Sequence, residues 1–556
     1  MRDLADSYVT SLATLNPLLA TRLGLAQGQD QLPDLSPSGH QAQDDLAWST
    51  LTELKGLLRA GPPDDPDERR CAHLLRERLA AGLAVSAAGE HLRDLRNIFG
   101  PINQVRGVFL LMPASSSGDW AVIASRMARV PDALAGHRAS LTEGARRGMF
   151  AAPRQVSTVV EQLGDWVTAA GGRGWFAGLA AAAEVPPALR AELDAAAAAA
   201  ISAVAGLRDW LAGEYLPRAR QTPDAVGEER YRIGARLWTG ADIDPGEAYA
   251  WGWSEYQRLR AEMERQAQAV RPGATAAEAM RYLDTDGESV EGVEEIRQRL
   301  QDIMDDTIAR VEGTHFRLAD PVRKVEARIA PEGSAAAPYY TPPTQDFSRP
   351  GRTWLPTLGQ TRFPLWNLVS TWYHEGVPGH HLQLAHWVYL ADRLSVFQTS
   401  VGSVSACSEG WALYAERLMD ELGFYAADPG ARLGYLDAQL MRAIRVVIDI
   451  GMHLRLRIPV DSPLAPGQAW TPDLGREFFA MHSGRAPAFV DSEIVRYLGA
   501  PGQAISYKLG ERAWLSGRQA ARAARGGGFD LASWHMAALS LGALGLDDLA
   551  GELARL

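Results

Sequence analysis

Hydrophobic residues recur with helical spacing through most of the chain, and Gly or Pro interrupts the pattern between segments. Residues 41–97 predict two or three helices, and residues 119–149 predict another pair. The alanine run at 195–200 lies within an apolar stripe, which favours a packed helix over a linker. Alternating Val, Ile and Thr runs are scarce, so the pattern predicts a mostly α protein.

The pattern changes between residues 320 and 360. Residues 325–329 alternate in polarity, and Pro338, Pro342 and Pro350 interrupt any helix that follows. This pattern of alternating residues and prolines predicts a small strand-and-loop region. It also marks the boundary that we expect between an N-terminal helical lobe, residues 1–320, and a C-terminal lobe, residues 321–556, which carries the chemistry.

Composition and charge narrow the function classes. The chain is 46% hydrophobic and 22% charged, as expected of a folded globular protein. Its formal charge of −11 favours neither a nucleic acid nor an anionic membrane as partner. Two widely separated cysteines, Cys71 and Cys407, an N-terminus without an apolar signal region, and the lack of any long uninterrupted apolar run predict a cytoplasmic protein. The oligomeric state stays open.

Three of the twelve histidines lie within eight positions, as His374, His380 and His381, and Glu375 follows the first. Clustered imidazoles beside a carboxylate are typical of zinc sites. A straight helix would separate His374 from His380 by about 9 Å, because six residues each rise about 1.5 Å. The intervening Pro378 and Gly379 break the helix and could let the two rings meet. His381 is the rival second ligand or a group behind the ligands, and the alternative to a metal site is a helix–turn–helix with capping and core histidines.

A third ligand is expected from the segment at residues 408–416, which offers Glu409 and Glu416. An apolar stripe through Trp411, Tyr414 and Leu418 turns both carboxylates to the opposite helix face. We favour Glu409 as the ligand, whereas Glu416 is either an alternative ligand, a group behind the ligands, or part of a solvated face.

Residues 442–453 form a second informative helix, in which the polar residues lie on one narrow stripe and the others are apolar. Two interpretations remain open. The stripe is either an internal ion pair of Arg445 with Asp449 beside a satisfied His453, or it lines a cleft in which His453 assists catalysis and Arg445 binds substrate.

Four blocks of the chain resemble, in the same order, the bacterial domain-of-unknown-function family eight-eight-five. They are residues 339–343 (YYTPP), 373–383 (YHEGVPGHHLQ), 409–416 (EGWALYAE) and 496–510 (RYLGAPGQAISYKLG). Weaker matches extend the resemblance over nearly the whole chain.

Members of this family look like relatives of helical zinc peptidases of the thimet oligopeptidase and Taq carboxypeptidase type. The resemblance implies one Zn²⁺ held by His374, His380 and Glu409, with Glu375 as general base. It also implies that a tyrosine, for which Tyr507 is our candidate, stabilises the tetrahedral intermediate. Arg496 and Lys508 are candidates for binding a substrate carboxylate.

The same resemblance implies an elongated two-lobed helical fold with a deep central channel and a small antiparallel sheet near the active site. We therefore expect a zinc-dependent peptidase, or another metal-dependent hydrolase, that acts on short peptides or peptide-like amides. The alternatives are a noncatalytic helical metal-binding or scaffold protein and a non-haem iron enzyme, since two histidines and a carboxylate also hold iron.

Overall fold

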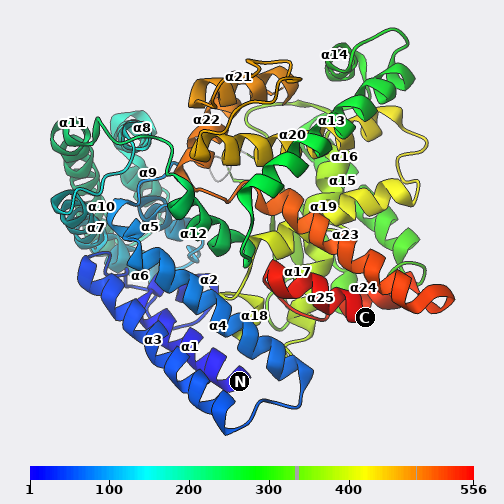
Figure 1. Ribbon diagram of the computed structural model, residues 1–556. Helices are drawn as coiled ribbons and strands as arrows, with labels where there is room; N and C mark the ends of the chain where they lie inside the picture. Colours follow the sequence, from blue (N-terminus) through cyan, green and yellow to red (C-terminus); the bar gives the residue numbers. More distant parts are fainter. Residues whose placement is uncertain (332–336, 484) are drawn as a thin grey trace.

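The computed structural model describes residues 1–331, 337–483 and 485–556, and it confirms a mostly α protein (Figure 1). Helices α1 to α15 are α1 (Arg2–Leu15), α2 (Pro17–Arg22), α3 (Pro37–Ala60), α4 (Pro66–Ala87), α5 (Pro101–Gly107), α6 (Ser117–Met127), α7 (Val130–Arg146), α8 (Pro153–Gly172), α9 (Trp175–Ala181), α10 (Pro187–Trp210), α11 (Leu216–Ala219), α12 (Glu228–Thr239), α13 (Pro245–Val270), α14 (Ala276–Asp286) and α15 (Val293–Val311). The helices predicted at 41–97 and 119–149 are therefore present.

Helices α16 to α25 follow a strand-containing segment. They are α16 (Leu368–Glu375), α17 (His380–Tyr389), α18 (Val396–Thr399), α19 (Ser405–Glu421), α20 (Pro429–Leu454), α21 (Pro472–Ser483), α22 (Pro487–Gly499), α23 (Ser506–Arg525), α24 (Leu531–Leu539) and α25 (Leu546–Arg555). Proline in the first turn begins many of the helices in both halves, because its fixed φ and missing N–H suit that position.

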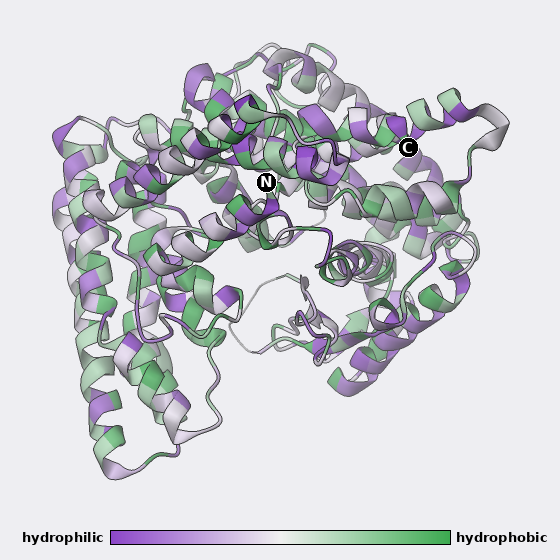
Figure 2. Ribbon diagram, turned by 90° about the horizontal axis from the view of Figure 1, so that it is seen from below, coloured by the Kyte–Doolittle hydropathy of each residue, from purple (hydrophilic) through white to green (hydrophobic). Residues whose placement is uncertain are grey.

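The buried apolar residues form two cores. The smaller core is built from α5 to α11 with a few residues before them, and it fills the lobe drawn in blue and cyan at the left of Figure 1. The larger core joins α1, α3 and α4 to the chain from α12 to the C-terminus. The division at residue 320 stays a prediction, but the packing itself places both chain ends in the larger core. Figure 2 shows hydrophobic and hydrophilic residues interleaved along the helices, as amphipathic packing requires.

One helical stretch, Pro187–Ala219, is long and apolar enough to cross a membrane when judged by length and composition. It comprises α10, a π-helical turn and α11. Leu193, Val204 and Leu207 of this stretch are buried in the smaller core, against neighbouring helices of the same lobe. The core helix of a soluble protein passes the same test, so this helix is weak evidence for a membrane span.

Two small sheets lie between α14 and α16. Strand β1 (Ser289–Glu291) pairs with β5 (Arg362–Pro364) in antiparallel orientation. A three-stranded sheet has the order β2–β4–β3, with β2 (Val325–Ile329) parallel to β4 (Gly351–Leu355) and β3 (Tyr339–Thr341) antiparallel to it. The strand predicted at 325–329 is confirmed. The expected small antiparallel sheet is present as β1–β5 and as the β3–β4 pair, whereas β2 runs parallel to β4.

Helices α19 and α23 pack backbone against backbone at Gly410 and Gly510. A Cβ atom at Gly410 would lie 2.5 Å from the Cα atom of Gly510, and one at Gly510 would lie 2.1 Å from the Ala406 carbonyl oxygen. Both positions therefore require glycine. Because Glu409 precedes Gly410 on α19, this contact sets how far that carboxylate stands from α23.

Candidate metal centre

The His-Glu-x4-His segment crosses a break between two helices. Helix α16 ends at Glu375, and α17 begins at His380 after a short turn that contains a cis Val377–Pro378 peptide bond. The Gly379 N–H donates to the Tyr373 carbonyl oxygen at 2.9 Å, so the chain folds back on the end of α16. A Cβ atom at Gly379 would lie 1.9 Å from the His374 carbonyl oxygen. Only glycine allows so tight a turn.

This turn brings the two imidazoles together. The ring centroids of His374 and His380 are 4.8 Å apart, and the rings are nearly perpendicular. Trp411 of α19 holds the turn by donating its indole N–H to the carbonyl oxygens of Pro378 and Gly379, each at 3.0 Å. The predicted break of the helix at Pro378 and Gly379 is therefore present, and it has the predicted effect on the histidines.

Glu409 of α19 completes a three-residue set, which we call the metal cluster: His374, His380 and Glu409. The three candidate ligand atoms lie within 4.8 Å of one another. Glu409 Oε2 is 3.3 Å from His374 Nε2 and 3.6 Å from His380 Nε2. Two ligands of a tetrahedral zinc ion with bonds of about 2.0–2.1 Å stand about 3.3 Å apart. The two distances to Glu409 are therefore close to this value, and the third pair of ligand atoms lies within 4.8 Å.

Two atoms of the metal cluster also lack a protein partner. His380 Nδ1 and Glu409 Oε2 are buried and have no hydrogen-bond partner among the described residues. A buried carboxylate oxygen without a donor is unfavourable unless a cation neutralises it. Burial lowers the pKa of His374, but the facing carboxylates of Glu409 and Glu416 raise it more, to about 9. The two carboxylates thus favour a positive charge at this place, which either a protonated ring or a bound cation supplies.

Glu416 lies behind the cluster rather than in it. Its Oε1 atom is 2.7 Å from His374 Nδ1, and its side chain is fully buried. A carboxylate that binds the second nitrogen of a metal-ligating histidine fixes the orientation of the ring. Of the alternatives for Glu416, the solvated face is wrong, because α19 is surrounded by protein on this side as well.

Ser370 and Arg442 also contact Glu416, and the sequence did not single out either as a site residue. The Ser370 hydroxyl donates to Glu416 Oε2 at 3.0 Å, and Arg442 Nη2 is 3.5 Å from Glu416 Oε1. Ser370 stands one turn before His374 on α16, and Arg442 begins the polar stripe of α20. Arg442 was therefore already part of the stripe, and following α16 back by one turn from His374 would have found Ser370.

His381 faces away from the metal cluster. Its Nε2 is 2.7 Å from the Val322 carbonyl oxygen, and its Nδ1 is 2.9 Å from the Tyr340 hydroxyl on β3. Since the carbonyl can only accept, Nε2–H donates to it and Nδ1 accepts from Tyr340. Burial lowers the pKa of His381 to about 4. His381 therefore joins α17 to the sheet, and both of its nitrogens are occupied.

Glu375 and Tyr507 lie beside the metal cluster. Burial raises the pKa of Glu375, whose charge interacts with His380 and His374. Burial also raises the pKa of Tyr507, and the charge of Glu409 raises it further. Both side chains are half-buried. The structure thus places a carboxylate and a phenol, the two groups expected to assist catalysis, close to the candidate ligands.

Arg445 and Arg496, which were expected to bind substrate, belong to a buried group that we call the α22 ion-pair cluster: Arg445, Glu493, Arg496 and Tyr497. Glu493 accepts from Arg445 at 2.8 Å, from Tyr497 at 2.6 Å and from Arg496 at 2.8 Å. The Arg445 guanidinium also lies 4.8 Å from the centroid of the Tyr507 ring. Both arginines are therefore committed to partners within the protein, and Arg445 supports Tyr507.

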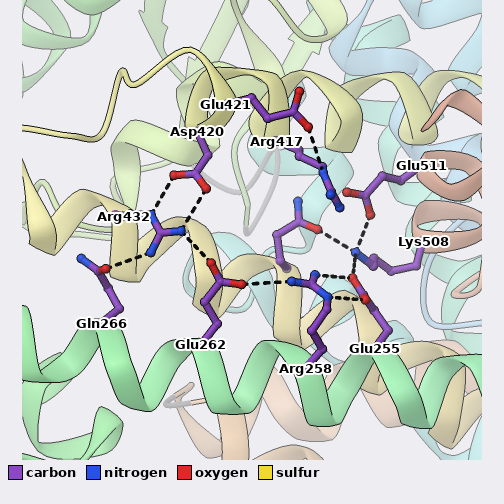
Figure 3. A network of polar contacts seen from close by, with 11 residues as sticks. Glu255, Arg258, Glu262, Gln266, Arg417, Asp420, Glu421, Arg432, Lys508 and Glu511 are labelled. Atoms are coloured by element: carbon purple, nitrogen blue, oxygen red, sulfur yellow. Dashed lines mark hydrogen bonds and ion pairs between the residues drawn. The ribbon is translucent and has the colours of Figure 1, made fainter. Parts of the chain in front are cut away.

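Lys508 and His453 are likewise held by internal partners. Lys508 is buried between Glu255 and Glu511, as Figure 3 shows, and its Nζ is 2.9 Å from Glu255 Oε1. His453 Nε2 is 3.1 Å from the Tyr497 carbonyl oxygen, and its Nδ1 accepts from the Val226 N–H. Burial lowers the pKa of His453 to about 4. The structure gives neither residue the exposed group that its expected role needs.

Asp449 does not pair with Arg445 either. Its Oδ2 atom accepts from the Tyr231 hydroxyl at 2.8 Å and from the Gly502 N–H at 3.1 Å. The polar stripe of α20 therefore divides. Arg442 and Arg445 face the metal cluster and its tyrosine, whereas Asp449 and His453 fasten α20 to α12 and to the loop before α23.

Two solved structures share this fold over the full length of the chain. A structure described as "the putative lipoprotein from Colwellia psychrerythraea" has a TM-score of 0.83 and 22% identity, and it covers 100% of this chain and 98% of that one. A "putative lipoprotein of unknown function from Shewanella oneidensis" has a TM-score of 0.75 and 17% identity, with 99% and 98% covered. No curated protein matches the sequence significantly.

The expected cytoplasmic location is wrong on this comparison, because both structures are of proteins described as lipoproteins, which are anchored to membranes or secreted rather than cytoplasmic. Two cysteines that are buried and far apart argue only against a disulfide between them, and they do not fix a compartment. The comparison with protein families identifies the family of the chain directly. Residues 17–553 match the family described as "Bacterial protein of unknown function (DUF885)", and the chain belongs to this family.

Proposed function

We propose that this protein is a metal-dependent hydrolase, with zinc as the ion that its ligands fit best, and that it cleaves short peptides or peptide-like amides. The observation that carries the proposal is the convergence of His374, His380 and Glu409 beside Glu375. Three protein ligands leave a fourth position open, which is the arrangement of catalytic rather than structural zinc sites.

Bound zinc would polarise the substrate carbonyl and make a water molecule more acidic. Glu375 is the group that accepts a proton from that water and returns it to the leaving amine, because it is the carboxylate beside the cluster that is not itself a candidate ligand. Burial raises its pKa, which keeps the proton affinity of this base high enough for transfer in both directions.

Tyr507 is suited to donate a hydrogen bond to the oxygen that gains charge during attack. Its raised pKa keeps the phenol protonated, and Arg445 lies against its ring at 4.8 Å. A donor that is already oriented loses no free energy to reorganisation when the charge develops.

A cavity lies beside α16, and its lining contains none of the metal cluster, Glu375 or Tyr507. It has a volume of about 770 Å³, and its lining includes Phe363, Asn367, Leu368 and Thr371. Thr371 is one helical turn before Glu375, so this cavity borders the helix that carries the proposed base. Pockets for small organic ligands commonly measure about 300–1,000 Å³, which suits a short peptide. The net charge of −11 gives no reason to expect a nucleic acid.

The same ligand set supports a second candidate. Two histidines and one carboxylate are also the facial ligands of non-haem iron enzymes. A noncatalytic metal-binding protein is the third candidate, and it would require a fully coordinated ion without water. The identity and coordination of the metal therefore separate the three functions.

The test uses protein purified without a histidine tag. We expect about one equivalent of zinc per chain by elemental analysis, and release of amino groups from a mixture of short peptides. Glu375→Gln should keep the metal and lose the turnover. Less than about half an equivalent of any transition metal would overturn the metal site. Iron in place of zinc would favour the second candidate, and unchanged turnover in Glu375→Gln would remove that residue as the base.

A further inference from the structure

A chain of buried hydrogen bonds leads from Lys508 to the metal cluster. Lys508 Nζ donates to Gln439 Oε1 at 2.9 Å, and Gln439 Nε2 donates to Glu416 Oε2 at 3.4 Å. Glu416 Oε1 then meets His374 Nδ1 at 2.7 Å. The four side chains are 0–3% exposed. The path therefore joins α23, α20, α19 and α16 without a solvent contact that could replace one of its members.

The chemistry of Lys508 fixes the direction of the first two bonds. An ammonium group has three donors and no acceptor. Gln439 must therefore turn its amide oxygen toward Lys508, and its NH₂ group must face Glu416. A flipped amide would place an NH₂ group against the ammonium and a carbonyl oxygen against the carboxylate, and both contacts would be repulsive.

The direction of the last bond follows from the surroundings of Glu416. The Gln439 amide and the Ser370 hydroxyl donate to Oε2, and Arg442 lies 3.5 Å from Oε1. An ionised carboxylate only accepts. His374 therefore carries its proton on Nδ1 and donates it to Glu416. In the neutral imidazole that a metal binds, the lone pair is then on Nε2, on the side of the ring that faces Glu409.

We propose that Gln439 and Lys508 are positioning residues that keep the lone pair of His374 on the nitrogen that faces Glu409, so that His374 is ready to bind the metal. The inference rests on the proposed metal site and adds to it two residues that do not contact the cluster. Lys508 acts by fixing the orientation of the Gln439 amide rather than by adding net charge, because Glu255 and Glu511 already balance its charge. Partners of ligating histidines typically change metal affinity by about 10–100-fold.

Two substitutions of Gln439 separate direction from packing. Gln439→Glu keeps the shape and the contact with Lys508, but it turns a carboxylate oxygen toward Glu416. Gln439→Met keeps the volume and loses both hydrogen bonds. If direction matters, zinc affinity measured by competition with a chelator falls about tenfold or more in Gln439→Glu, and by a smaller factor in Gln439→Met. If Gln439 only fills space, both variants bind zinc as the parent does, because both keep the volume, and this result would overturn the inference.

Gln266→Glu is the matched control. Like Gln439, Gln266 accepts a hydrogen bond from a cation, since Arg432 donates to its amide oxygen at 2.9 Å (Figure 3). Its NH₂ group donates to the Pro429 carbonyl oxygen at 2.9 Å. Gln266 reaches Lys508 only through the ion pairs of Arg432, Glu262, Arg258 and Glu255, and it contacts neither Gln439 nor Glu416. The zinc affinity of Gln266→Glu should therefore equal that of the parent. Affinities are compared per folded molecule, with folding followed by circular dichroism. Parent protein that binds no zinc would overturn the proposed function, whereas tight parent binding with an unaffected Gln439→Glu would overturn only this inference.

Discussion

Two buried polar clusters lie near each other in the larger core, and they differ in whether their hydrogen-bonding groups are satisfied. In the α22 ion-pair cluster each oxygen of Glu493 meets at least one donor, from Arg445, Arg496 or Tyr497. In the metal cluster Glu409 Oε2 and the nitrogens that face it bring acceptors together, and Glu409 Oε2 has no donor among the described residues. A satisfied cluster contributes to stability, whereas an incomplete one has a place for a ligand.

The largest effect on the metal cluster is expected from His374→Ala, which removes one of its three candidate ligands. Removing one of three ligands should reduce zinc affinity by more than the 10–100-fold typical of a partner behind a ligand, so the purified variant should carry no zinc by elemental analysis. His381→Gln is the control, because both nitrogens of His381 already have protein partners. It should keep zinc and lose about 1–3 kcal/mol of unfolding free energy through an unsatisfied partner. Zinc lost from His381→Gln but kept by His374→Ala would reverse the assignment.

Substitution of Glu493 is expected to have the opposite result, a loss of stability without a loss of zinc affinity. Glu493→Gln leaves the buried Arg445 and Arg496 without a counter-charge, which should lower the unfolding free energy by about 3–5 kcal/mol. Urea unfolding followed by circular dichroism measures this loss. The folded fraction should still bind zinc with the parent affinity, because Glu493 contacts no ligand. Equal stability of parent and variant would contradict the structural role of the cluster.

Glu493 should also make the unfolding free energy depend on pH, which is a smaller effect. Burial raises the pKa of Glu493, but the charges of Arg445 and Arg496 lower it more, to about 2. The folded pKa is therefore below the usual value of 4.5, so this carboxylate stabilises the fold above about pH 4.5 and loses that contribution as the pH falls toward 2. Unfolding free energies measured from pH 5 to pH 3 should fall less steeply in Glu493→Gln than in the parent. Parallel curves would show that Glu493 does not titrate in this range.

The sequence predicted which residues converge at the candidate site better than it predicted the partners of the surrounding charged residues. The break at Pro378 and Gly379, the two histidines and the carboxylate 29 residues after His380 were all accessible from spacing along the chain. Some partners of the cations are local, because Glu493 lies three residues before Arg496 and Glu511 lies three residues after Lys508. The pairing of Arg445 with Glu493 and of Lys508 with Glu255 joins distant helices and was not accessible. Arg445, Arg496 and Lys508 therefore looked available for substrate although each is held in an internal ion pair.

Glu416 shows a second limit of prediction from the sequence, which concerns the surroundings of a helix. A helical wheel separates apolar from polar positions, and it assigns the polar side to solvent when nothing else is known. Helix α19 is instead enclosed on most sides, so its polar side faces other polar side chains. The mostly α fold and the strand at 325–329 were predictable because they depend on local periodicity. The direction of the β2–β4 pairing depends on a crossover that leaves no local signal.

The glycine contact between α19 and α23 makes the position of Glu409 depend on two residues that have no side chain. Gly410 and Gly510 meet backbone to backbone, so no side chain between these helices can change rotamer to absorb a displacement. Movement of α23 would therefore pass to the carboxylate almost undiminished. Tyr507 and Lys508 lie on α23 as well. The α19–α23 contact therefore fixes the relative positions of Glu409, the Tyr507 phenol and the start of the hydrogen-bond path to His374.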